Sequence, residues 1–567
     1  MLFLLLGCPP ATLEPDLPED SSPKVDTQPL GDCEVLGLPT RDFIQDVDSH
    51  TDLNGLATDF TIVLRDGTEW TLSERWTGCD TYLFIQDEPA QARGWRVWDR
   101  DLDTFLEKLP KNTHVFFMSS QFGADAREES LALLEVDLAK EVNRLSDEDQ
   151  RWWADRLHIG KKQDIALGNW IGEINKKWGW GVGIDRFQRI RFVGSYADPT
   201  RYNGTWFDPN MAMAANEPIF YNYEAATSDA VDALGGIEVP IFQGETCSGS
   251  AYVDVELPPA EELAEFDTLW MDAEMRCVGA GEYGDCPAWD YMAYVYRCSW
   301  PLEDNPYAAT ACEAEETKTG TCQKPGGVTA EGTYSCNEDG TGFNDLSCPC
   351  DTEVGRWITT YHREGQWWHD ISAYLPLIDD GGPQKWRFQT SGPYEISMDL
   401  RFSNTGKEAR PDEAWYLFDG GRTGVGYNDN HEDIVLTVPA DAKQVFLATV
   451  ITQHGSDGNN CGEFCNIAHH FGVNGTETVH DFPEATQGWD CHDRVGVDGT
   501  VPNQYGTWWY GRAGWCPGKQ VPTVMTDVTD QVVLGGENTF SYNAFYAGKE
   551  YESGATIRMR SWLVIAR

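Results

Sequence analysis

Basic residues are scarce in this chain of 567 residues: 42 lysines and arginines stand against 92 aspartates and glutamates, a formal net charge of −50. That charge would repel a polyanion, so nucleic acid and anionic membrane surfaces are not expected partners. Beyond its first few residues the sequence has no run that is long and apolar enough to span a bilayer. It also has no Cys-x-x-Cys pair, so a dithiol redox role lacks its chemistry.

Cysteine, by contrast, is abundant. The sixteen cysteines exceed what we expect of a cytosolic chain, and their spacings do not match zinc ribbons, so they predict disulfides and export. Residues 1–8 form a short apolar stretch that ends in Leu-Leu-Gly-Cys, similar to a lipoprotein signal, in which Cys8 would carry the lipid. We therefore expect an outer-membrane or cell-surface lipoprotein, or a secreted protein. Without Cys8 fifteen cysteines remain, so one is free or intermolecular.

The N-terminal part of the chain changes in composition at about residue 45. Residues 9–44 are rich in Pro, Asp and Glu, which predicts an acidic disordered linker. Residues 45–225 have a mixed α/β pattern, and residues 183–194 resemble the late strand hairpin of thioredoxin-like domains. We expect a degenerate thioredoxin-like domain here, in which Cys79 pairs with Cys33.

The C-terminal part of the chain is rich in strands. Apolar and polar residues alternate over 396–402, for example, as in a half-buried strand. A mainly β architecture follows: two antiparallel eight-stranded jelly-roll-type β-sandwiches packed side by side. We place the first at 240–405 and the second at 406–567. A Cys-rich insertion, residues 298–350, interrupts the first.

Two carboxylates lie beside short cysteine motifs. Asp290 follows Cys286-Pro-Ala-Trp, and Glu463 lies inside Cys461-Gly-Glu-Phe-Cys465. A disulfide across such a small loop would present its contents rigidly, and two such carboxylates could form a general acid/base pair. Because most of the 92 acidic residues must be solvated surface groups, this assignment depends on a larger pattern.

That larger pattern is a resemblance to the peptide-N-glycosidase F family. The run 512–518, Arg-Ala-Gly-Trp-Cys-Pro-Gly, followed by Val-Pro-Thr at 521–523, is similar to the family's signature near its end. The run 461–465 is similar to its Cys-Ala-Glu-(Trp/Phe)-Cys, and the run 286–290 to its Cys-Asp-Glu-Trp-Asp. The three motifs occur in family order within about residues 245–567.

The resemblance implies an amidase. The enzyme would hydrolyse the amide between the innermost N-acetylglucosamine and asparagine of N-linked glycoproteins, releasing a glycosylamine and leaving aspartate. Asp290 would be the principal catalytic carboxylate, and Glu463 would assist through water. Neither a metal nor a cofactor is needed, and we expect a monomer. The disulfides implied are Cys277–Cys286, Cys461–Cys465 and Cys491–Cys516.

Other residues are expected to contact substrate. Arg512 could stabilise charge, and aromatic rings can stack on the C–H faces of sugars. The sequence departs from the family at Ser391, where the family has a second assisting glutamate, and at Gly511, where it has aspartate. A catalytically silent glycan-binding or adhesion protein of the same fold is therefore the alternative. The expected substrate-binding residues are Arg512, Trp289, Trp515, His454, Trp508, Trp509 and Ser391.

Overall fold

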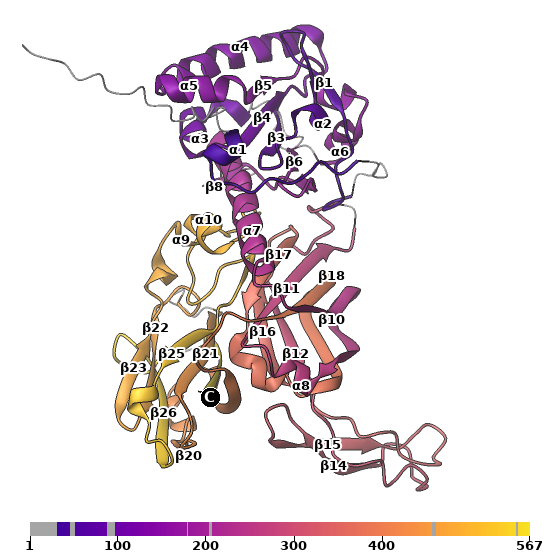
Figure 1. The fold of residues 1–567 in the computed structure, drawn as a ribbon, viewed down its shortest axis with the longest axis vertical. Helices are drawn as coiled ribbons and strands as arrows, with labels where there is room; N and C mark the ends of the chain where they lie inside the picture. The colour runs from indigo at the N-terminus through magenta and orange to yellow at the C-terminus, as the bar shows by residue number, and fades with distance from the viewer. Residues whose placement is uncertain are drawn as a thin grey trace, which may run out of the picture.

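The computed structural model describes residues 31–567 except 46–51, 88–96, 179, 203–206, 280, 456–460 and 552–553. It is a mainly β protein of several sheets, with a helical N-terminal part at one end (Figure 1). The anchor expected at Cys8 and most of the predicted linker lie outside the described residues.

The N-terminal part is a mixed α/β unit. Its five strands are ordered β5-β4-β3-β6-β7; β3, β4 and β5 are parallel, and β6 and β7 form an antiparallel hairpin over the expected residues. Every residue of β3 and β4 is buried, since helices cover both sheet faces. The name thioredoxin-like stays a prediction. The elements are β3 (Thr81–Gln86), β4 (Thr113–Met118), β5 (Leu157–Ile159), β6 (Gly181–Ile184), β7 (Ile190–Phe192), α3 (Leu102–Lys108), α4 (Ala124–Val142), α5 (Asp147–Ala154) and α6 (Trp170–Trp178).

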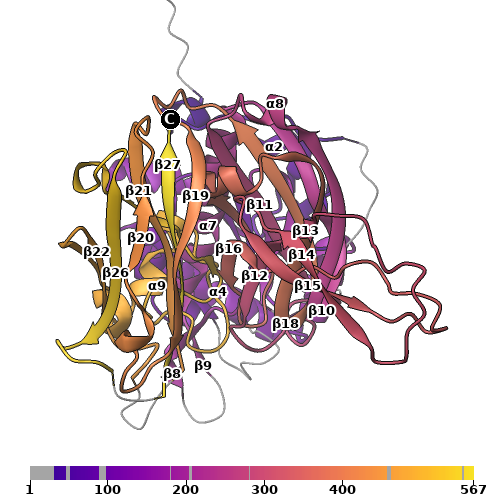
Figure 2. The same cartoon turned by 90° about the horizontal axis from the view of Figure 1, so that it is seen from below.

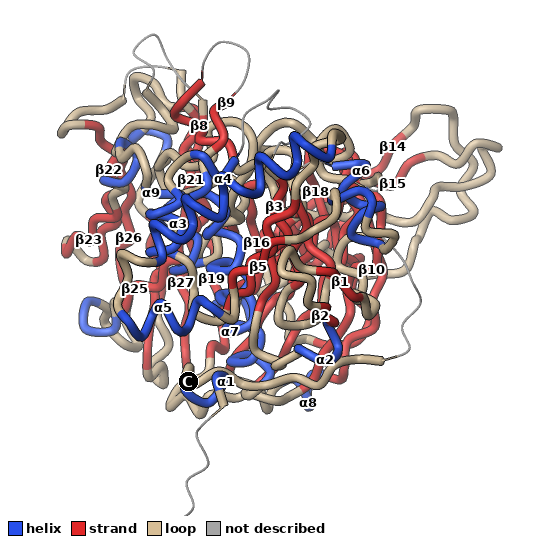
Figure 3. Tube along the Cα trace, turned by 90° about the horizontal axis from the view of Figure 1, so that it is seen from above, coloured by secondary structure: helices blue, strands red, loops and turns tan. Residues whose placement is uncertain are grey.

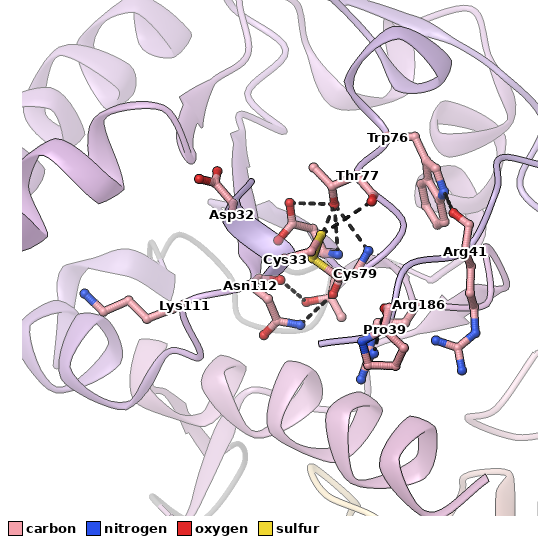
Figure 4. Close-up of a disulfide and its surroundings, with 12 residues drawn as sticks. Asp32, Cys33, Pro39, Arg41, Trp76, Thr77, Cys79, Lys111, Asn112 and Arg186 are labelled. Atoms are coloured by element: carbon pink, nitrogen blue, oxygen red, sulfur yellow. Dashed lines mark hydrogen bonds between the residues drawn. A yellow bond between two sulfur atoms is a disulfide. The ribbon is translucent and has the colours of Figure 1, made fainter. Parts of the chain in front are cut away.

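Residues 31–45 pack against this unit. They contain the short helix α1 (Asp32–Val35), and the expected Cys33–Cys79 disulfide is confirmed. The Trp76 indole donates to the carbonyl of Arg41 at 2.8 Å, beside that disulfide (Figure 4). The prediction of a disordered linker is therefore wrong for residues 31–44, because a disulfide and tertiary hydrogen bonds fix them despite their polar composition.

One long helix, α7 (Asn216–Asp232), joins the α/β unit to the β part (Figure 1). It contacts β3 of the α/β unit, and also β17 and the short helix α10 (Val495–Asp498) of the β part. Asn216 and Glu217 in its first turn are buried. Glu217 accepts hydrogen bonds from Arg363 and Asn503, so this turn lies where the α/β unit meets both β units.

The first β unit is one hydrogen-bonded sheet of seven strands, one fewer than expected, ordered β17-β11-β18-β12-β16-β24 with β10 beside β18. Residues 394–403 of β18 pair with β11, and residues 386–390 of β18 pair with β12. Because β10 pairs with both parts of β18, the sheet has two wings, one on the side of β11 and one on the side of β12, which are joined through β10 and β18. The wings face each other across the core: Phe242 packs against Phe388, with ring centroids 6.1 Å apart. The strands are β10 (Ile237–Pro259), β11 (Thr268–Cys277), β12 (Met292–Arg297), β16 (Thr352–Ile358), β17 (Gly365–Asp370), β18 (Gly381–Ser403) and β24 (Lys519–Gln520).

The second β unit contains two antiparallel four-stranded sheets around a core of its own. One sheet is ordered β19-β27-β21-β25 and the other β20-β26-β22-β23. Figure 2 shows β19 and β27 beside β16 and β12 of the first unit. The strands are β19 (Pro411–Arg422), β20 (Ile434–Thr437), β21 (Gln444–His454), β22 (Ile467–Val473), β23 (Thr476–His480), β25 (Val524–Asp527), β26 (Glu537–Tyr546) and β27 (Thr556–Ala566).

The Cys-rich insertion projects away from the body of the protein (Figures 1 and 3). It carries a small sheet of β13 (Trp300–Pro301), β14 (Thr317–Gln323) and β15 (Thr329–Ser335). Its core is small, built around Tyr334, Phe343 and Leu346. The disulfides Cys298–Cys350, Cys312–Cys336 and Cys322–Cys348 close it.

Seven disulfides form within the described residues, including the three that the resemblance implies. They fit an extracellular, oxidising environment. Among the cysteines that the structure describes, Cys247, buried in β10, is free. No described helix is both long enough and apolar enough to cross a membrane.

Candidate active site

Asp290 lies where a disulfide-bound turn leads into β12. The Cys277–Cys286 disulfide holds the turn, and β12 begins two residues after Asp290. The Tyr361 hydroxyl donates a hydrogen bond of 2.6 Å to Oδ2 of Asp290, and Arg512 Nη2 lies 3.7 Å from the same oxygen. Burial raises the pKa of Asp290, while Tyr361 and Arg512 act in the opposite direction. The carboxylate is thus desolvated but supported by a hydroxyl and a guanidinium.

Arg512 is the most enclosed member of this cluster, with a side chain 1% exposed. Its guanidinium donates to the carbonyls of Thr507 and Tyr510 and to the Thr507 hydroxyl, at 2.7–3.1 Å. It also lies over the Trp515 ring, 4.8 Å from the centroid. These contacts hold the Arg512 guanidinium close to the Asp290 carboxylate, so Arg512 is a positioning residue. The prediction that Arg512 contacts substrate directly is wrong, because its side chain is almost fully buried.

Glu463 occupies the small loop closed by Cys461–Cys465. Its backbone N–H donates to Gly455 O at 3.0 Å, and its carbonyl accepts from Ala513 N at 2.8 Å. The loop needs glycine at 462, because φ is +92° there and a Cβ would lie 2.1 Å from Gly455 O. Burial and the negative charge of Asp290 raise the pKa of Glu463 to about 7, against the opposing effect of Arg512. Glu463 can therefore exchange a proton near neutral pH.

A cleft of about 650 Å³ opens between the two β units. Its lining includes Asp290, Ser391 and His454, three of the residues expected from the sequence. Glu463 is not part of that lining. The cleft also carries three tyrosines and several charged groups. These are Tyr291, Tyr294, Tyr296, Glu353, Arg356, Asp419, Arg558 and Arg560.

His454 is held as a neutral ring at the edge of this cleft. Burial, with Arg356, Arg558 and Arg512 nearby, lowers its pKa to about 3. Its Nε2 lies 2.8 Å from the Thr452 hydroxyl, and its ring stacks on Trp515 at 5.0 Å. A neutral imidazole at this place can hydrogen-bond a sugar without adding charge.

The four tryptophans that were expected to contact substrate differ in burial and in their contacts. Trp289, next to Asp290, is 63% exposed and free to stack on a sugar. Trp515 is buried, and its indole donates to Gln453 O at 2.7 Å, so it supports Arg512 and His454. The prediction that Trp508 contacts substrate is wrong, because its side chain is fully buried. Trp509 is half-buried, with its ring 6.3 Å from that of Trp489.

Two residues that matter at the site were not assigned from the sequence. Tyr361 binds Asp290, and Thr507 binds Arg512 through its carbonyl and hydroxyl. Tyr361 ends the run Trp-Ile-Thr-Thr-Tyr, residues 357–361, whose place between the cysteine motifs was the available signal.

The loops that carry Tyr361 and Thr507 share a buried anchor on α7. The Arg363 guanidinium donates to Glu217 at 2.9 Å and to Glu282 at 3.1 Å, and it also contacts Pro502 O. Asn503 donates to the same Glu217 oxygen at 2.8 Å. Glu217 of the α/β unit thus holds both loops that position Tyr361 and Arg512.

One group of potential metal ligands occurs among the described residues. It joins Asp490 with Cys491 and Cys516. Since the two cysteines form a disulfide, they offer no thiolates, and the remaining single carboxylate is not a metal site.

Fold and site together define a mainly β, disulfide-rich protein with two desolvated carboxylates near a cleft between β units. Residues 426–564 match the family model described as Peptide-N-glycosidase F, C terminal. The chain thus resembles the peptide-N-glycosidase F family in its C-terminal part. The match includes Glu463 and Arg512, whereas Asp290 lies outside it.

Similar solved structures carry related titles. Recombinant peptide:N-glycanase F is 16% identical, with 58% of this chain and 95% of that chain covered and a TM-score of 0.38. PNGase F, a glycosylasparaginase from Flavobacterium meningosepticum, is 16% identical, with 58% and 96% covered and a TM-score of 0.39. PNGF-II is 14% identical, with 70% and 75% covered and a TM-score of 0.39. A comparison with the curated proteins gave no match.

Proposed function

We propose that this chain is a peptide-N4-(N-acetyl-β-glucosaminyl)asparagine amidase that acts on N-linked glycoproteins and glycopeptides. The family match over residues 426–564 supports a hydrolase of the glycoamidase type. The observation that carries the proposal is the cluster of Asp290, Tyr361 and Arg512 at a cleft, with Glu463 nearby at a pKa of about 7.

Asp290 acts as the base. An amide is a poor electrophile, so the attacking water must lose a proton as its oxygen bonds to the asparagine side-chain carbonyl carbon. Asp290 lines the cleft and takes that proton. Tyr361 and Arg512 keep the carboxylate oriented and ionised, against the burial that raises its pKa.

Glu463 completes the proton transfer. When the C–N bond breaks, the glycosylamine nitrogen must gain a proton, and the asparagine becomes aspartate. An acid with a pKa of about 7 is well matched to donate that proton near neutral pH. Because Glu463 does not line the cleft, the proton passes through a water.

Three further residues suit the sugar. Trp289, which precedes Asp290 in the chain, offers an exposed aromatic face outside the cleft lining, and His454 and Ser391 offer neutral polar groups within that lining. Such a combination of an apolar face with a few placed polar groups is typical of small-molecule sites. Oxidised cysteines support action outside the cytosol, and a lipid anchor at Cys8 is part of the same proposal.

Ser391 favours a second candidate, a glycan-binding protein that does not cleave. It is exposed in the cleft at the position where the resemblance implies an assisting carboxylate. In that case the cleft would hold the sugar while the amide stays intact.

Mass spectrometry of a synthetic N-glycopeptide, incubated with the full chain in ¹⁸O-labelled water, tests the proposal. Conversion of asparagine to aspartate carrying one heavy oxygen is expected, and Asp290→Asn should abolish it. A control variant, Asp433→Asn, changes an exposed aspartate and should keep full activity. An intact glycopeptide across a panel of glycans contradicts the amidase, and binding without cleavage then identifies the second candidate.

A further inference from the structure

A second recess lies where the Cys-rich insertion meets the first β unit. This groove has a volume of about 780 Å³. One wall comes from β10 and β18, through Tyr252, Asp254, Lys385 and Arg387 among others. The other wall comes from the insertion and includes Cys298, Cys348 and Cys350. Since these cysteines belong to two disulfides, the insertion wall is covalently braced.

The groove lining has the chemistry of a carbohydrate site. Tyr252 is 52% exposed, and Trp300 is half-buried on the insertion side; both rings can take the C–H face of a sugar. The carboxylates and cations of the lining can hydrogen-bond hydroxyl pairs.

The groove continues the cleft that holds Asp290. Tyr296 of β12 lies opposite Arg387 of β18, which in turn lies opposite Tyr252 of β10. Residues directly opposite in a sheet share a face. Tyr296 lines the cleft and Arg387 lines the groove, and the guanidinium lies 4.3 Å from the centre of the tyrosine ring. The two recesses are therefore neighbours on one sheet face.

The spacing suits an extended ligand. Along β18, Ser391 and Gln389 line the cleft, whereas Arg387 and Lys385 line the groove. Alternate residues of a strand share a face. Six residues at ~3.3 Å each give a path of roughly 20 Å from Ser391 to Lys385. A ligand fixed at Asp290 by its reducing end can reach the groove only if it is a long, branched or linear oligosaccharide.

We infer that the groove is a second glycan subsite, which binds the outer, neutral part of the N-glycan whose innermost sugar lies at Asp290. This rests on the proposed function. The lining balances acidic Asp254 and Glu256 with basic Lys385 and Arg387, and the whole chain carries a charge of −50. Both favour neutral hexoses over acidic sugars. The insertion thereby sets which glycans the enzyme prefers.

Two glycopeptides of the same peptide, one with a two-sugar core and one with an extended neutral glycan, test the inference. Tyr252→Ala should raise KM for the extended substrate about tenfold, a typical effect of one aromatic contact. Cleavage of the two-sugar substrate should stay unchanged. Tyr546→Ala, a control at a 41% exposed tyrosine of β26, should change neither. An equal effect on both substrates, or none on the extended one, overturns the subsite.

Calorimetric binding of the free extended glycan separates this inference from the proposed function. Asp290→Asn should bind it, and the double variant with Tyr252→Ala should bind it about tenfold more weakly, whether or not the wild type cleaves. If wild-type protein cleaves glycopeptides but the free glycan binds equally to both variants, the subsite is refuted while the amidase stands. If no variant binds the glycan, the subsite is likewise refuted.

Discussion

Replacing Glu463 with glutamine should stabilise the protein at alkaline pH and not at acidic pH. Burial raises the pKa of this carboxyl from 4.5 to about 7. Below pH 4.5 the group is protonated in both folded and unfolded chains, so it contributes nothing. Between pH 4.5 and about 7 the unfolded chain releases the proton and the folded chain retains it, so stability falls as pH rises.

The full penalty is present above about pH 7. A difference of this size between folded and unfolded pKa corresponds to roughly 3 kcal/mol, at about 1.4 kcal/mol for each pH unit. Glutamine carries no charge to desolvate, so Glu463→Gln should recover that free energy at pH 8.5. For a domain of this size, 3 kcal/mol corresponds to a rise in Tm of roughly 6–12 °C.

The assay is thermal unfolding of wild type and Glu463→Gln at pH 4.5 and pH 8.5, followed by the transition of the second β unit. Glu537→Gln, at an exposed residue of β26, is the matched control and should give the same Tm difference at both pH values. A Glu463→Gln variant that is equally stabilised at both pH values, or stabilised at neither, would refute the reasoning. Glu463→Gln should also lack amidase activity. The burial that destabilises the ionised carboxylate is the same burial that raises the pKa of Glu463 to about 7, where it can donate a proton.

Three further changes probe the supports of the site. Tyr361→Phe removes one hydrogen bond to a charged group, worth about 1.5–3 kcal/mol. It should therefore lower kcat about 10- to 100-fold and move the acidic limb of the pH–rate profile upward, because Asp290 is then harder to ionise. Glu217→Gln breaks a buried ion pair with Arg363; it should destabilise the fold by about 3 kcal/mol and speed hydrogen exchange of residues 359–364, measured by mass spectrometry. The paired change of Cys461 and Cys465 to serine should lower kcat with an unchanged circular dichroism spectrum, because only the loop around Glu463 loses its brace.

Each of these has a clear opposite result. An unshifted pH profile in Tyr361→Phe would mean that the hydroxyl does not act on Asp290. If Glu217→Gln speeds hydrogen exchange evenly over the whole chain, the variant has lost stability in general, and Glu217 does not specifically hold residues 359–364. Full activity in the serine pair would show that the small disulfide is not needed to place Glu463.

Local patterns in the sequence predicted much of the fold. The alternation at 396–402 correctly indicated a half-buried strand, now part of β18. The length of β10 and β18 could not be predicted, because Gly249, Gly392 and Pro383 would each end a strand by local rules. In the structure β10 continues through several irregularities of register, since pairing with neighbours on both wings outweighs local propensity.

The resemblance named the residues of the candidate site but not the contacts between them. It assigned Asp290 and Glu463 through the cysteine motifs in family order, and their catalytic roles stay predictions. Tyr361 and Asp290 are 71 residues apart in the chain. Their contact depends on how two loops pack against α7, and no local sequence pattern predicts that packing. Nor could adjacent Trp508 and Trp509 be told apart, since burial of one and partial exposure of the other is decided by tertiary packing.

The Cys298–Cys350 disulfide at the base of the insertion has a consequence for survival among proteases. It joins the two points where the insertion leaves and re-enters the body. A protease that cuts the chain once between them therefore makes a nicked molecule, not two pieces. Inside it, Cys312–Cys336 and Cys322–Cys348 keep most single nicks from releasing a free end. The Cys-rich insertion projects from the body and is therefore exposed to proteases. Its disulfides allow it to be cleaved once and still form one wall of the groove.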